Sequence, residues 1–174
     1  PLADINVVVN GATGATLTMN AGTQFTTTVD GTNYNFVTIG SNIISPIDGV
    51  YTFSNLKIYE GTYVTYNYTA DTTDIDQKFL IQSENADTTT LSVQVQNSAS
   101  DTTTNTYTKA TSITELDSDS KVYFLQESDD GKFEVYFGDG VVGKAIEDGN
   151  IIILKYVVTN KAAANGATTF SLSG

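Results

Sequence analysis

Carboxylates are the side chains of this 174-residue chain with the greatest capacity for chemistry. The chain carries 20 Asp and Glu against eight lysines, and it contains no His, Cys or Trp. Two acidic clusters stand out, one at Asp71, Asp74 and Asp76 and one at Asp117 and Asp119. Ca²⁺ takes oxygen ligands, but neither cluster follows the calcium-loop pattern, in which a glycine stands at the sixth position. We therefore interpret both clusters as solvated acidic loops and expect no metal site.

The missing residue types exclude several classes of enzyme. Without His there is no Ser-His-Asp triad, and without Cys there is no thiolate nucleophile or disulfide. A glycosidase needs only two carboxylates, but no pair is marked out by its spacing. A net charge of −12 and the absence of arginine disfavour a nucleic-acid partner. We expect a protein that is not an enzyme and that uses no cofactor.

A glycine-rich stretch at 137–144 nearly matches a phosphate-binding loop. Gly138 and Gly143-Lys144 have the required spacing, but Ala145 replaces the hydroxyl residue. Asp139 between Gly138 and Gly140 places a carboxylate where phosphate would lie. The stretch instead predicts a tight structural turn at a strand exit, which glycine backbones can follow.

Dense turn signals indicate short antiparallel strands. Asp-Gly and Asn-Gly pairs tolerate the positive φ of hairpin turns. They occur at 10–11, 30–31, 48–49, 130–131, 139–140, 148–149 and 165–166. Gln24–Val29 and 33–39 should pair around Asp30-Gly31, and Val122–Glu127 should pair with Phe133–Phe137 around 129–131.

One predicted strand, Ile151–Val158, is apolar almost throughout. Such a pattern indicates a central strand or a strand whose outer face is covered by another domain or subunit. The candidate interface residues are therefore Ile151, Ile153, Tyr156 and Val158. A central strand buried inside its own sandwich gives the same pattern, and we favour that interpretation.

The whole pattern predicts an all-β chain of two β-sandwich-like modules, at 1–69 and 70–174. The last strand, 168–172, has two possible places, in the second module or back in the first. No run approaches the length needed to cross a bilayer, so we expect no membrane insertion. The chain starts at Pro1 without a basic leader, and we expect it to be a fragment of a longer protein.

Several segments, taken in order, resemble the baseplate wedge protein of contractile-tailed bacteriophages, the baseplate J-like family. The segments are Leu17 to Phe25, Tyr34 to Val37, Ile58 to Gly61, Asp87 to Val95, Val122–Glu127, Phe133 to Gly140, Gly149-Asn150, Lys155-Tyr156 and Ala164 to Gly166. The most specific part is the unit Phe137-Gly138-Asp139-Gly140 with the following Gly149-Asn150, which we take as structural turns.

The resemblance implies a structural role in the tail baseplate of a virion assembled in the bacterial host cytoplasm. It implies contacts with other baseplate and tail proteins, a homo-oligomer, and a part in ring assembly and tail contraction. The alternative function is a cell-surface adhesin or carbohydrate-binding β-sandwich module, either with or without a dependence on calcium. Both functions are consistent with an acidic chain whose strands are rich in Thr and Asn.

Overall fold

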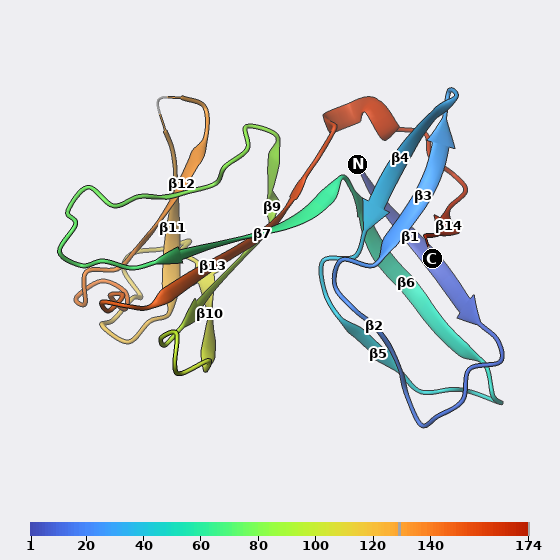
Figure 1. Cartoon of the computed structure of the whole chain (residues 1–174), viewed down its shortest axis with the longest axis horizontal. Coiled ribbons are helices and arrows are strands. Elements are labelled where there is room, and N and C mark those ends of the chain that lie inside the picture. Colours follow the sequence, from blue (N-terminus) through green and yellow to red (C-terminus); the bar gives the residue numbers. More distant parts are fainter. Residues whose placement is uncertain (129, 174) are drawn as a thin grey trace. The chain divides into compact units, whose positions relative to one another are not determined.

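A computed structural model describes residues 1–128 and 130–173 of the chain. The regular elements of the described chain are strands, apart from one 3₁₀ turn, as the all-β sequence pattern predicts, and the sheets are mostly antiparallel (Figure 1). It divides into two compact units, which we call unit 1 (residues 1–63 and 157–174) and unit 2 (residues 64–156). The sequence-based division at 69/70 stays a prediction about domains.

Unit 1 contains two sheets. Its elements are β1 (Leu2–Val9), β2 (Leu17–Met19), β3 (Gln24–Val29), β4 (Thr32–Val37), β5 (Asn42–Ile44), β6 (Tyr51–Glu60), the 3₁₀ turn η1 (Lys161–Ala164) and β14 (Ser171–Leu172). The larger sheet has the order β1-β6-β4-β3-β14, and β2 pairs with β5 (Figure 1).

The core of unit 1 follows from alternation along its strands. Phe25, Phe36, Phe53 and Ile58 point to the same side of the larger sheet and are buried together with Met19 of β2. Leu56 of β6 joins the same core, whereas the alternating residues Thr52, Ser54 and Lys57 of this strand are exposed. This is the pattern of a sheet with one buried face, so unit 1 is sandwich-like.

The hairpin between β3 and β4 confirms the pairing expected around Asp30-Gly31. Residues Gln24 to Val29 pair in register with Val37 to Thr32. Asp30 and Gly31 have φ of 49° and 80°, the positive values that a tight two-residue hairpin turn requires. The C-terminal strand β14 lies against the other edge of β3, with Ser171 opposite Thr26.

Unit 2 is built on one seven-stranded sheet. Its strands are β7 (Thr62–Thr69), β8 (Phe79–Leu80), β9 (Ala86–Gln96), β10 (Thr104–Lys109), β11 (Val122–Glu127), β12 (Phe133–Phe137) and β13 (Ile151–Val158), in the spatial order β7-β13-β9-β10-β11-β12-β8. The first residues of β7 and the last of β13 belong to unit 1.

The sheet of unit 2 curls until its two edge strands meet. The Tyr68 hydroxyl of β7 donates a 2.6 Å hydrogen bond to the carbonyl oxygen of Leu80 in β8, and the Tyr68 ring packs edge-on against Phe79. Phe79 in turn contacts Phe137, and Phe137 contacts Tyr107. A row of edge-to-face aromatic rings therefore forms the interior of the curled sheet.

The second expected hairpin is also present. Strands β11 and β12 pair from Tyr123–Phe137 to Glu127–Phe133, as the sequence predicts. Asp129 of the expected turn lies outside the described residues. One pair departs from the antiparallel pattern, because β10 and β11 run parallel over Thr108–Val122 and Lys109–Tyr123. The connection between them, 110–121, is consequently a long loop on the surface of unit 2.

Candidate functional site

Three loops of unit 2 lie side by side, and we call them together the loop face: residues 70–78, 110–121 and 138–150. Backbone hydrogen bonds join the second loop to the third, from Gly143 N to Asp117 O at 2.9 Å and from Lys144 N to Ser120 O at 2.8 Å. The first and third loops are joined through Ala70, whose N–H and C=O both bond to the segment 149–150. The loop face contains the residues predicted as structural turns, which are Gly138, Asp139, Gly140, Gly149 and Asn150.

The Gly138–Gly143 turn is built by close approach of its own backbone. A Cβ on Gly138 would overlap the carbonyl oxygen of Gly143, so only glycine fits there. Asp139 Oδ1 accepts hydrogen bonds of 2.9 Å from the N–H groups of both Val141 and Val142. These bonds hold the pKa of Asp139 below its usual value. The N–H groups that a phosphate would need already bind this carboxylate, which supports a structural turn.

Asn150 holds the third loop in place from inside the unit. Its side chain is buried; Oδ1 accepts from Glu147 N at 2.7 Å, and Nδ2 donates to Asn97 O at 2.8 Å. The neighbouring Gly149 has a φ of 79° and donates its N–H to Ala70 O. The expected Gly149-Asn150 turn therefore links three segments of unit 2, and a buried amide with both ends bonded stabilises such a junction.

Other carboxylates of unit 2 bind their own loops in the same way. Asp71 accepts from the hydroxyl and N–H of Thr73, and Asp117 accepts from the Ser120 hydroxyl and Asp119 N. These bonds lower the pKa of both carboxyls, so both are ionised at neutral pH. Within residues 1–128 and 130–173 no three acidic side chains are grouped as a metal site would require.

Strand β13, which supplies the candidate interface residues, is central in the sheet between β7 and β9. Tyr156 is fully buried, whereas Ile151, Ile153 and Val158 are half-buried. Burial raises the pKa of Tyr156 to about 12, and its hydroxyl accepts a 3.1 Å bond from Gln82 N. The Tyr156 ring therefore packs inside unit 2, and the interface role expected for the four residues stays a prediction.

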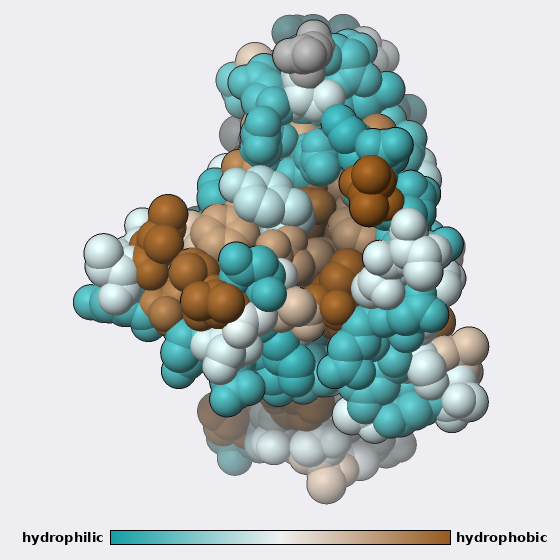
Figure 2. Space-filling view, turned by 90° about the vertical axis from the view of Figure 1, so that its left-hand side faces the viewer, coloured by the Kyte–Doolittle hydropathy of each residue, from teal (hydrophilic) through white to brown (hydrophobic). Residues whose placement is uncertain are grey.

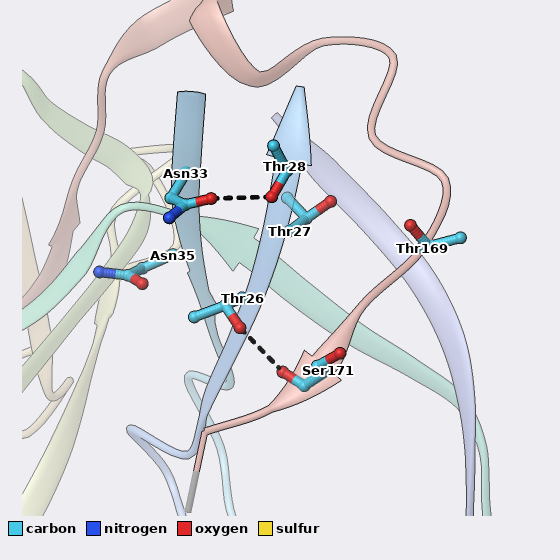
Figure 3. Close-up of a pocket in the computed structure, with 7 residues that line it drawn as sticks. All are labelled: Thr26, Thr27, Thr28, Asn33, Asn35, Thr169 and Ser171. Atoms are coloured by element: carbon cyan, nitrogen blue, oxygen red, sulfur yellow. Dashed lines mark hydrogen bonds between the residues drawn. The ribbon is translucent and has the colours of Figure 1, made fainter. Parts of the chain in front are cut away.

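Unit 1 carries a polar pocket of about 390 Å³. Figure 3 shows its lining on β3, β4 and the C-terminal segment. The residues are Thr26, Thr27, Thr28, Asn33, Asn35, Thr169 and Ser171. Two hydrogen bonds cross it, from Thr28 Oγ1 to Asn33 Oδ1 at 2.7 Å and from Thr26 Oγ1 to Ser171 O at 3.4 Å. The lining contains only hydroxyl and amide side chains, so it offers hydrogen bonds but no acid or base.

Sequence patterns did not identify Glu60, the buried carboxylate of unit 1. It is 1% exposed and accepts three bonds, from Thr159 Oγ1 at 2.7 Å, Asn160 N at 2.9 Å and Asn160 Nδ2 at 2.7 Å. These donors lie about one hundred residues further along the chain. No local signal could have revealed this site, because an acidic residue at the end of a strand usually faces water.

Exposed aliphatic side chains of the loop face were missed as well. Ile75, Ile113 and Val141 each stand in one of the three loops and are largely exposed. In the sequence each is an isolated apolar residue among polar ones, and scattered exposed aliphatics are normal. Only the hydrogen bonds between the loops bring together the three segments that carry them.

The site can now be set beside a search for membrane helices and beside comparisons with known proteins. In the described part of the chain, no helix is long and apolar enough to cross a membrane. Residues 65–168 match the family model described as "Bacteriophage baseplate wedge protein gp6, third domain". This match covers well over half of the chain, including the whole loop face and all but one residue of unit 2. No curated protein sequence matches the chain.

Proposed function

The chain belongs to the family of the bacteriophage baseplate wedge protein gp6, and we propose that it acts by protein–protein contacts that assemble the wedge ring and rearrange when the tail contracts. The observation that carries this proposal is the family match over residues 65–168, because it includes the curled sheet, apart from the first three residues of β7, and its loops. The role is structural and needs no catalytic group or cofactor.

The composition of the two units supports a protein that works through its surfaces. Unit 2 carries 16 of the 20 acidic side chains and six of the eight lysines, a net charge of −10, against −2 for unit 1. Such a concentrated charge favours partners of the opposite sign at the surface of unit 2. We propose other baseplate and tail proteins as partners, a homo-oligomer in the full-length protein, and assembly in the bacterial host cytoplasm.

Deleting the gene from the phage genome and supplying it from a plasmid tests the proposal. We expect the deletion to yield virions without complete baseplates in negative-stain electron micrographs, and the plasmid copy to restore them. Immunogold labelling of intact tails should place the chain at the tail end that carries the baseplate. Normal baseplates and full infectivity after the deletion would refute the structural role.

A second candidate function, a carbohydrate-binding or adhesin module, has one observation in its favour. The polar pocket of unit 1 is lined by hydroxyl and amide groups, which can exchange hydrogen bonds with sugar hydroxyls. A glycan array with the wild-type chain and an Asn35→Ala variant tests it, with and without calcium. Binding to a glycan that Asn35→Ala weakens would support this second function, and an array without binding would dismiss it.

A further inference from the structure

The loop face carries three largely exposed aliphatic side chains within a strongly acidic surrounding. Ile75 is 95%, Val141 73% and Ile113 64% exposed. Each comes from a different loop, so three separate segments of unit 2 present an isoleucine or valine to solvent. Apolar surface of this kind is stabilised when another molecule covers it.

These three loops are fixed relative to one another. Gly143 and Lys144 donate backbone hydrogen bonds to the 117–120 segment, and Thr72 N donates to Asp148 Oδ1 at 3.2 Å. On the face that Figure 2 shows, hydrophobic residues in brown lie at several places among hydrophilic ones in teal. The loops therefore hold their aliphatic side chains on a preformed surface, which reduces the entropy lost on binding.

The charge around these side chains is strongly negative. The loop face contains nine carboxylates against three lysines, which accounts for half of the chain's net charge of −12. Among the described residues, the ion pairs use Asp4, Asp130 and Glu134, and none of these belongs to the loop face. Since Asp71, Asp117 and Asp139 bind backbone or hydroxyl donors, they stay ionised without a cationic partner.

We propose that the loop face is a docking surface for a different protein whose own surface carries an apolar centre surrounded by lysine or arginine. Ile75, Ile113 and Val141 supply the apolar contact, and the surrounding carboxylates supply charge complementarity. A second copy of the chain fits poorly, because two like-charged loop faces would repel each other. The proposal rests on the proposed function in one respect, which is that the natural partner is a baseplate protein.

Binding of a defined probe tests the surface chemistry directly. The probe is a fluorescein-labelled peptide of lysine and leucine, followed by fluorescence anisotropy, with a lysine-only peptide of the same charge as reference. We expect the I75S/I113S/V141S variant to bind the lysine–leucine peptide about tenfold more weakly than wild type. The matched control is I43S/I47S, which removes two exposed aliphatic side chains of unit 1 (66% and 79% exposed) and should bind as wild type does.

A second pair of variants isolates the charge. D76N/E115Q/D119N removes three charges from the loop face at side chains that accept no hydrogen bond from residues 1–128 and 130–173, and D4N/D30N/D48N removes three from unit 1. We expect only the first to weaken binding, by about fivefold at low salt and less at high salt. The proposal would be overturned if the aliphatic variant of the loop face bound the peptide as strongly as its unit 1 control. It would also be overturned if the charge variant of the loop face bound as strongly as its own unit 1 control. Wild-type self-association, measured by sedimentation, that I75S/I113S/V141S abolishes would overturn it as well.

Phage assembly separates this proposal from the broader one. If plasmid-borne I75S/I113S/V141S fails to restore baseplates while I43S/I47S restores them, the docking surface is supported. If both restore baseplates and the gene deletion removes them, the docking surface is refuted and the structural role stands. If the deletion itself has no effect, the structural role fails, whatever the peptide measurements show.

Discussion

The polar pocket of unit 1 and the loop face of unit 2 place polar groups in different ways. In the pocket, Thr and Asn side chains stand on neighbouring strands and bond to each other, as Thr28 does to Asn33. In the loop face, carboxylates turn back onto the N–H groups of their own loops, as Asp139 does. The strands thus form a neutral surface, whereas the loops form a charged one on which aliphatic side chains point outward.

Most of the net negative charge of the chain therefore lies in unit 2. Loops need groups to satisfy backbone N–H donors that no neighbouring strand accepts, and Asp does this well. Unit 2 has the longer loops and therefore most of the carboxylates. We therefore expect changes to loop geometry and to pH to alter the stability of unit 2. Changes to buried polar groups of unit 1 should leave the stability of unit 2 unchanged.

Replacing Gly138 by alanine should produce the largest effect. The new Cβ would overlap the backbone of Gly143, and neither backbone can move without breaking the turn, so we expect unit 2 to lose about 4 kcal/mol of unfolding free energy. Gly40→Ala is the control, because nothing lies near its Cβ position. Hydrogen exchange measured by mass spectrometry reports each unit separately. Equal protection in the two variants would contradict the close approach at Gly138.

Removing the buried carboxylate of unit 1 should have the next largest effect. Glu60→Ala leaves donors of Thr159 and Asn160 without their acceptor in a partly buried site, so we expect unit 1 to lose about 2 kcal/mol. Asp4→Ala is the acidic control; its pair with Lys57 is exposed and should contribute about 0.5 kcal/mol or less. Urea unfolding with hydrogen exchange measures both variants. A loss of unfolding free energy in unit 2 alone would contradict the assignment of Glu60 to the interior of unit 1.

Acid should loosen the loops of unit 2. Bonds from the Asn97 amide and from Thr103 lower the pKa of Asp101 from 3.8 to about 2. Because the pKa of Asp101 in the folded chain lies below its pKa in the unfolded chain, ionised Asp101 stabilises the fold. This stabilisation is complete above about pH 4 and is lost as the pH falls through about 2. Carbon-detected NMR titration of the carboxyl groups measures the value. An Asp101 pKa near 3.8 would show that these bonds do not form in solution.

The smallest effect is expected in the polar pocket. Thr28→Ala removes one exposed side-chain hydrogen bond to Asn33 and should cost about 0.5 kcal/mol. Thermal unfolding followed by circular dichroism, compared with Thr32→Ala beside the same hairpin turn, measures it. A loss as large as that of Glu60→Ala would mean that the pocket side chains stabilise unit 1 as strongly as its buried carboxylate does.

Local features of the chain were predictable because they depend on neighbouring residues. Asp30-Gly31 specifies a tight turn through its positive φ, and the alternating residues around it specify two paired strands. The β11–β12 hairpin and the turn at Gly138 to Gly140 follow in the same way. The ordered segments around Phe133 to Gly140 were also enough to indicate the family that the match over 65–168 shows.

The tertiary structure decided what depends on distant residues. Glu60 became a buried acceptor only because Thr159 and Asn160 return to it, and β14 joined β3 across most of the chain length. The loop face likewise exists only because backbone bonds join loops that are far apart in sequence. Sequence by itself therefore determined the all-β character, the turns and the family. Long-range hydrogen bonding and burial decided which polar groups are enclosed and which aliphatic side chains are left for a partner.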